Sequence, residues 1–167
     1  MKLAVGDIVV YGSHGAGPVT ARESKVLLGT RQEVIELELI GGLRVELPLA
    51  RAHELLRPLA TESDLKRVKA VLRADPAVSS DTWLKRKKAS LARLTDGDPV
   101  GLAQIIRDGA SRDAARITNG SKAPRSLWER EMATRARGLL STEIAFAREI
   151  EPEEANGWID LQLSRCH

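Results

Sequence analysis

The order of apolar and polar positions changes character near residue 60. Before that point, short runs rich in Val, Ile and Leu are separated by glycines. One of them, TRQEVIELELI, alternates Val34, Leu37 and Leu39 with glutamates. Alternation of this kind predicts strands with one solvent-facing side. Because about four or five such strands fit before residue 57, we expect a small, strongly bent β-barrel.

Two glycine clusters mark turns between these strands. In VVYGSHGAGPVT, Gly12, Gly15 and Gly17 follow an apolar run, which raises the question of a phosphate-binding loop. Such a loop leads into a helix and usually carries Gly-Lys-Ser/Thr, whereas this segment continues as a strand. A corner with close backbone approach is the preferred interpretation. Gly41-Gly42 predicts a two-residue hairpin turn.

From Thr61 onward the apolar spacing is helical. The pattern predicts five helices: one from Thr61 that ends at Asp75-Pro76, one from near Trp83 to the TDGDP turn, one carrying Leu102, Ile105 and Ile106, a long one over about 127–150, and a short one in PEEANGWIDLQL. A polar segment (77–81) and a mobile loop within the stretch ITNGSKAPRS (117–126) separate them. The fold class is therefore α+β, with a β-barrel over 1–57 and an all-α bundle of about five helices over 61–167.

Composition favours a folded protein, with 43% hydrophobic and 29% charged residues. The basic excess lies in the middle, because residues 61–120 carry twelve Lys and Arg against eight Asp and Glu. Neither a signal peptide nor a membrane-spanning stretch is evident, so we expect a cytoplasmic protein. The single cysteine, Cys166, excludes an internal disulfide.

Candidate sites for catalysis or metal binding are weak. His14, His53 and His167 lie in unrelated segments without the spacing of a zinc site. The TDGDP turn has too few acids for a calcium loop and is better explained as a helix cap. No serine lies in a G-x-S-x-G motif. We therefore expect no enzymatic activity, no catalytic residues, no metal and no cofactor.

A tryptophan beside a basic cluster is the most distinctive feature. On a helix, Arg86 and Lys87 follow Trp83 by three and four residues and flank it on one side. Lys and Arg can neutralise phosphates, and a large aromatic side chain can wedge into a minor groove. The alternative is that Trp83 caps the interhelix core and the cations are solvated; the spacing leaves both open. Trp128 and Trp158 are expected to pack in the core.

Taken together, VGDIVVYGSHGAGPV, LPL, DTWLKRKKASLARLTDGD, IIRDGASRD and EREMATRARGLLSTEIAFA resemble the CarD family of bacterial transcription regulators. The resemblance spans nearly the whole chain. It implies a Tudor-like domain that docks on the RNA polymerase β subunit by pairing sheet edges, and a helical DNA-binding domain. In the implied mechanism, a tryptophan enters the minor groove at the upstream edge of the transcription bubble and stabilises the open promoter complex. The resemblance also implies a nucleoid-associated location.

The matching motif assigns the DNA contacts. Trp83 would be the wedge, and Lys85, Arg86 and Lys88 would contact phosphates. Lys87 is added because its helical position is next to Trp83. Recognition of this kind depends on phosphates and groove shape, so we expect it to be only weakly sequence-specific.

The polymerase contacts match less closely. Lys25 and Leu27 lie on one docking strand, whereas the other has Glu46 at the basic position, with Arg44 displaced. Docking would then be weaker, or the partner's charge would differ. The stretch 117–126 is longer than the family implies. The alternative function is a Tudor/KOW-type module that engages RNA or the ribosome, although the charge balance of residues 1–60 argues against a nucleic-acid-binding barrel. We expect a monomer.

Overall fold

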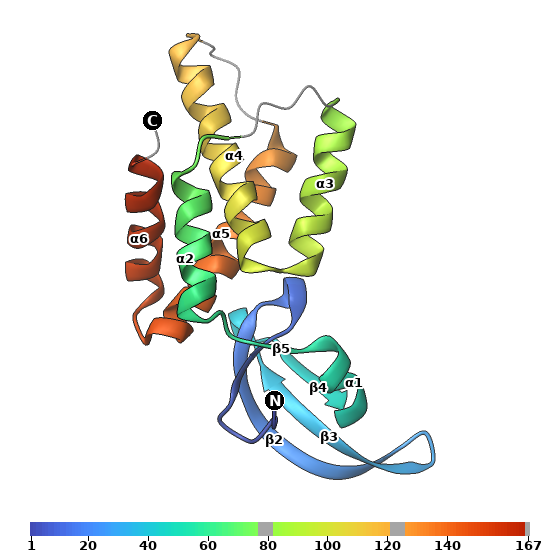
Figure 1. Cartoon of the computed structure of the whole chain (residues 1–167). Helices are drawn as coiled ribbons and strands as arrows, with labels where there is room; N and C mark the ends of the chain where they lie inside the picture. Colours follow the sequence, from blue (N-terminus) through green and yellow to red (C-terminus); the bar gives the residue numbers. More distant parts are fainter. Residues whose placement is uncertain (77–81, 121–125, 166–167) are drawn as a thin grey trace. The chain divides into compact units, whose positions relative to one another are not determined.

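The computed structural model describes residues 1–76, 82–120 and 126–165 (Figure 1). The chain forms two units, Met1–Leu59 and Ala60–His167, each with its own hydrophobic core. A five-stranded sheet in the first and helices in the second confirm the α+β class. The predicted segment 77–81 and residues 121–125 of the predicted loop lie outside the described residues.

The first unit is an open antiparallel sheet in the order β4-β3-β2-β1-β5. Its elements are β1 (Ile8–Val10), η1 (Gly12–His14), β2 (Ala16–Leu27), β3 (Thr30–Glu38), η2 (Ile40–Gly42), β4 (Arg44–Pro48), α1 (Leu49–Leu55) and β5 (Arg57–Pro58). Since β4 and β5 occupy opposite ends of the order, the predicted small barrel is not closed. The open sheet remains consistent with a Tudor-like domain.

The length and composition of the end strands explain why the sheet stays open. β5 has only two residues, and one of them, Pro58, has no N–H to donate to a further strand. The chain between β4 and β5 instead forms α1, whose Ala52 is fully buried and which packs on β3 and β4. The sequence reading missed α1, although Leu49, Ala52 and Leu56 have helical spacing.

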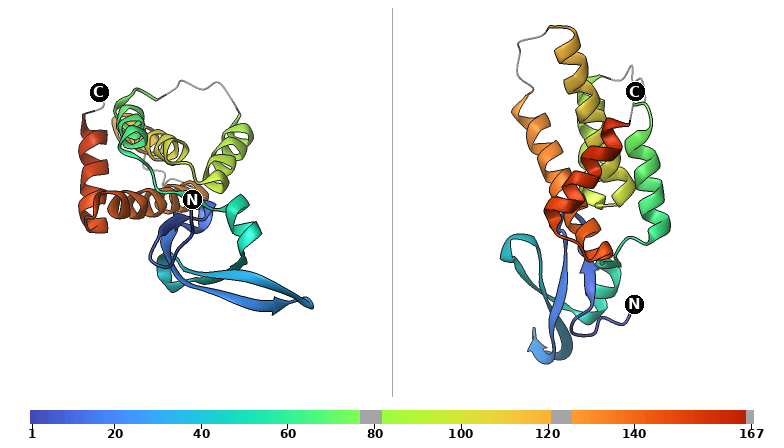
Figure 2. Two further views of the ribbon diagram at one scale, coloured as in Figure 1. Left: turned by 60° about the horizontal axis from the view of Figure 1, so that its bottom comes forward. Right: turned by 90° about the vertical axis from the view of Figure 1, so that its left-hand side faces the viewer.

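Strand β2 bends the sheet. Its pairing with β3 shifts register between Val19 and Ala21, as in a β-bulge. One end of β2 pairs with β1 and the other only with β3, so the β2–β3 hairpin extends as a long twisted ribbon (Figure 2). On β3, the fully buried Ile35 and Leu37 face the core. Val34, which the predicted alternation grouped with Leu37, is buried on the other face.

The glycine clusters are turns. The corner of the first cluster is η1, between β1 and β2, where Gly12 and Gly15 have positive φ, +43° and +98°. Gly17 already lies in β2, and a Cβ there would lie 1.9 Å from the carbonyl oxygen of Glu38, so the close backbone approach requires glycine. Gly41 and Gly42 both have positive φ, +77° and +78°. Their turn spans residues 39–43, because Glu38 pairs with Arg44, and is therefore longer than the predicted two-residue turn.

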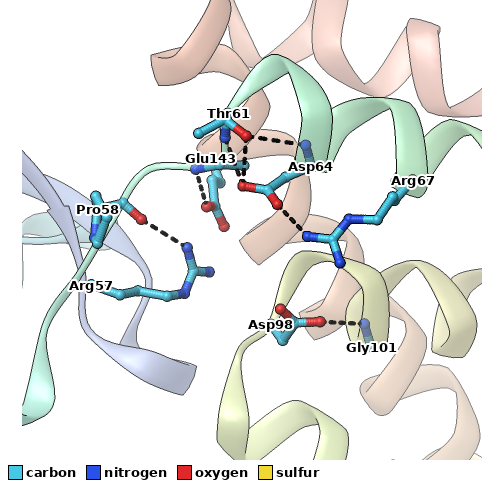
Figure 3. Close-up of polar contacts among 9 residues, drawn as sticks. Arg57, Pro58, Thr61, Asp64, Arg67, Asp98, Gly101 and Glu143 are labelled. Carbon is cyan, nitrogen blue, oxygen red and sulfur yellow. Dashed lines mark hydrogen bonds and ion pairs between the residues drawn. The ribbon is translucent and has the colours of Figure 1, made fainter.

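The second unit contains the helices α2 (Glu62–Arg73), α3 (Trp83–Asp96), α4 (Pro99–Thr118), α5 (Leu127–Arg148) and α6 (Pro152–Ser164). Of these, α2, α3 and α5 begin where the sequence predicts. Side-chain caps fix the starts of α2, α3, α4 and α5, whereas α6 begins at Pro152 without one. Thr61 and Asp64 form a capping box on α2, and Asp98 accepts a hydrogen bond from the N–H of Gly101 in α4 (Figure 3). Gly97, in the left-handed conformation, ends α3, so the TDGDP turn is a capping turn.

The helical core is formed mainly by α2, α4, α5 and α6, with Leu65, Leu72, Leu102, Leu140, Ile144 and Ile159 among its most buried side chains. α3 packs on α4 and α5 and contributes one buried residue to the core, Leu94. Leu84 and Leu91 of α3 are instead 68% and 50% exposed. Most of the surface of α3 is therefore available to solvent or a partner.

Candidate functional site

The start of α3 fixes the position of Trp83. The Thr82 side chain accepts a hydrogen bond from the N–H of Lys85 at 3.3 Å, which caps the helix and makes Trp83 its first residue. The side chain of Trp83 is large and apolar, yet the residue is 47% exposed. Trp83 is not among the partly buried residues that pack against the helical core, and nearly half of its surface is in water.

The buried side of Trp83 contacts a second tryptophan. The rings of Trp83 and Trp128 are 6.3 Å apart in an edge-to-face arrangement, with an interplanar angle of 68°. The ammonium of Lys87 lies over both, 5.0 Å from the Trp83 ring centre and 5.2 Å from that of Trp128. Trp128 is only partly buried against the helical core, so the expectation that it is a core residue holds for part of its surface only.

A shallow hollow surrounds this aromatic pair. Its lining residues are Trp83, Arg86, Lys87 and Ser90 of α3, Arg112 of α4, and Trp128 and Glu129 of α5. Glu129 pairs with Arg112 at 3.7 Å and with Arg116 at 3.4 Å. The hollow therefore joins three helices and combines aromatic surface with cationic side chains. Sequence reasoning did not identify its residues on α4 and α5.

The remaining cations of the motif, Lys85 and Lys88, do not line the hollow. Lys85 and Lys88 are exposed and stand within the first two turns of α3, where no acid lies in the first turn. The helix dipole favours anions at this end, so consecutive cations there are locally unfavourable. Such a local conflict is typical of a functional surface.

The sheet carries the second group of expected site residues. Lys25 on β2 donates to Glu46 on β4 at 2.5 Å, with side chains 39% and 49% exposed. This hydrogen bond raises the pKa of Lys25 above its usual value. Both residues line a shallow depression on one face of the sheet together with Glu23 and Glu36. Lys25, at the docking position that matches the family, and Glu46, at the position where a base was expected, are thus hydrogen-bonded to each other.

Strand β4 lies at the end of the sheet order and pairs with β3. Arg44 is exposed on this strand and Leu27 is partly exposed at the tip of the β2–β3 hairpin. The structure therefore brings Lys25 and Glu46 together but holds Leu27 and Arg44 at separate points of the same sheet.

Metal-ligand groups and membrane-spanning helices were searched for in the described residues. Across residues 1–76, 82–120 and 126–165, no group of three or more His, Cys, Asp or Glu side chains is arranged to hold a metal ion. His14 packs edge-on against Tyr11, with ring centres 4.7 Å apart. In the same part of the chain, none of the helices combines the length and apolar character needed to cross a membrane.

Comparison with known proteins assigns both units. A family model described as CarD, C-terminal domain, matches residues 67–160, and one described as CarD-like/TRCF RID domain matches residues 3–60. A Bacillus subtilis (strain 168) protein named "Putative transcription factor YdeB" is 23% identical over 152 residues, or 90% of this chain and 95% of that protein. These matches support a transcription-associated role that involves RNA polymerase. The resemblance seen in the sequence motifs is confirmed, and the chain belongs to the CarD family.

Proposed function

We propose that this protein is a non-enzymatic transcription regulator that binds the RNA polymerase β subunit through residues 1–57 and promoter DNA through α3. Trp83 would enter the minor groove at the upstream edge of the transcription bubble and stabilise the open promoter complex. The observation that carries the proposal is the half-exposed Trp83 at the start of a helix whose next two turns are cationic.

The chemistry of this surface suits DNA. Lys85, Arg86 and Lys88 can neutralise backbone phosphates, which gives salt-sensitive binding with little sequence preference. A large apolar side chain inserted at a base step resists restacking of that step, and restacking is required for the bubble to close. Lys87 belongs to the same surface, although its ammonium lies over two aromatic rings.

The polymerase contact is proposed for the β2–β3–β4 part of the sheet. β4 ends the strand order, and a strand in that position can add a partner strand through its backbone groups. Side chains then set the partner's charge, with Lys25, Leu27, Arg44 and Glu46 as the proposed contacts. Because Glu46 is bonded to Lys25, this protein presents less net positive charge to an acidic partner than two basic residues would.

The DNA part of the proposal is tested by the lifetime of open complexes formed with the cognate polymerase. Wild-type protein should prolong the lifetime, and Trp83→Ala should abolish most of that effect. Leu84→Ala is the matched control, because Leu84 is a neighbouring exposed apolar residue outside the hollow. If the wild-type protein leaves the lifetime unchanged, the open-complex mechanism is wrong. If Trp83→Ala is fully active, the wedge is wrong while polymerase binding can still hold.

The docking part is tested by binding to the isolated β subunit. Glu46→Arg removes the partner of Lys25 and adds a cation, so binding to an acidic lobe should become tighter and more salt-dependent. Glu54→Arg is the control, since Glu54 lies on α1 and pairs with Arg51 there. Weaker binding by Glu46→Arg would contradict an acidic partner surface or the assumed strand register.

A further inference from the structure

The side of Trp83 that faces the protein is enclosed by Lys87 and Trp128. We propose that these two residues form a socket that sets the orientation of Trp83, and that Lys87 is a positioning residue and not a phosphate contact. This inference rests on the proposed function, because it concerns the same tryptophan. It also goes beyond that function, since Trp128 and Lys87 would act on DNA only through Trp83.

The ring contacts support the socket. Lys87 follows Trp83 by one helical turn, and its ammonium is within about 6 Å of both ring centres, the usual limit of a cation–π contact. One cation therefore bridges two rings that already meet edge to face. To reach a phosphate, the ammonium would have to leave both aromatic faces. Lys85 and Lys88 are exposed, and within the described part of the chain neither lies over an aromatic ring.

The socket is itself attached to the helical bundle. Trp128 is in the first turn of α5 and packs partly against the helical core. The next residue, Glu129, has a side chain only 10% exposed and pairs with Arg112 and Arg116 of α4. These ion pairs join the start of α5 to α4. Trp128 is therefore held in place and can support the ring of Trp83.

The physical benefit is preorganisation. A freely rotating Trp83 would lose side-chain freedom when it enters a groove, and that loss would weaken binding. A ring that is already held by Trp128 and Lys87 has less freedom to lose. The effect should therefore appear in the free protein, before any DNA or polymerase is present. A phosphate contact, in contrast, would appear only in the complex.

The test combines spectroscopy of the free protein with open-complex lifetimes. The protein has three tryptophans, so ¹⁵N-labelled indole groups give three resolvable N–H signals. Lys87→Met removes the charge and keeps the aliphatic chain, Lys87→Arg keeps the cation, and Lys85→Met is the matched control for loss of a lysine charge. Lys87→Met should shift the signals of Trp83 and Trp128, whereas Lys85→Met should shift neither.

The lifetime measurements supply the functional readout. Lys87→Met should shorten the open-complex lifetime about two- to fivefold, the range expected for one exposed cation–π contact, and Lys87→Arg should restore it. The loss should persist at raised salt, where the loss caused by Lys85→Met becomes small. An unchanged Trp83 signal in Lys87→Met, or a salt dependence like that of Lys85→Met, would overturn the socket. If the wild-type protein has no effect on the open-complex lifetime, the proposed function is wrong. The socket is then tested by the indole N–H signals of the free protein alone.

Discussion

Glu143 offers the sharpest test of how the helical unit is held together. It lies in the C-terminal third of α5, is 2% exposed, and accepts a hydrogen bond from the N–H of Ala60 at 2.9 Å through one carboxylate oxygen (Figure 3). Ala60 is 8% exposed and directly precedes the capping box of α2. The carboxylate therefore anchors the beginning of the helical unit to its longest helix.

Glu143→Ala removes the acceptor and leaves the N–H of Ala60 in a buried setting. An unsatisfied buried donor costs about 1–3 kcal/mol, and the lost methylene contacts add about 1–2 kcal/mol. The free energy of unfolding should therefore fall by about 2–5 kcal/mol. Glu143→Gln keeps a carbonyl acceptor and nearly the same volume, so its cost should be clearly smaller.

Tryptophan fluorescence in a urea titration is the appropriate assay. All three tryptophans lie in residues 60–167, so their emission reports unfolding of the helical unit without a direct signal from the sheet. Glu131→Ala serves as the control, because Glu131 is exposed on the same helix. A Glu143→Ala midpoint equal to that of Glu131→Ala would show that this hydrogen bond does not stabilise the unit.

Three further predictions follow from local geometry. Gly17→Ala would force a Cβ to 1.9 Å from the Glu38 carbonyl oxygen, so thermal unfolding should show a loss of about 1–3 kcal/mol or more. The backbone hydrogen bond from Thr61 holds the pKa of Asp64 below its usual value of 3.8. The stability that the ionised Asp64 contributes is present at neutral pH and is lost as pH falls below about 4. The free energy of unfolding of Asp64→Asn should therefore depend less on pH below about 4. Lys88→Met should lower the salt slope of DNA binding by about 1.

The helix starts were predictable because each depends on residues close in sequence. Thr61 and Asp64 are three residues apart and cap the same helix. Thr82, immediately before Trp83, and Gly97, immediately after Asp96, likewise mark α3 by local hydrogen bonding and backbone conformation. In such cases the sequence neighbours are also the physical partners, and no knowledge of the tertiary structure is required.

The errors arose where distant segments decide the outcome. Whether a bent sheet closes depends on whether its end strands meet, and the alternation within each strand carries no information about that. The contact of Trp83 with Trp128 joins residues 45 positions apart, so helical spacing around Trp83 could identify Arg86 and Lys87 but not the second ring. One signal was available: Trp128 lies in the first turn of a helix capped by Ser126, ahead of the helix's apolar core stripe.

Variants at the two proposed interfaces should have different effects. The polymerase interface would set what fraction of open complexes carries the protein, and the DNA interface would set how long a complex that carries it survives. In the proposed mechanism, docking on polymerase would hold α3 near the DNA at high effective concentration, so a few phosphate contacts would suffice. A docking variant such as Arg44→Glu should therefore shift the protein concentration needed to prolong the open complex and leave the maximum lifetime unchanged. Trp83→Ala should lower the maximum lifetime with little change in the concentration required. If excess protein restores Trp83→Ala to the wild-type lifetime, Trp83 contributes to affinity alone and the wedge mechanism is wrong.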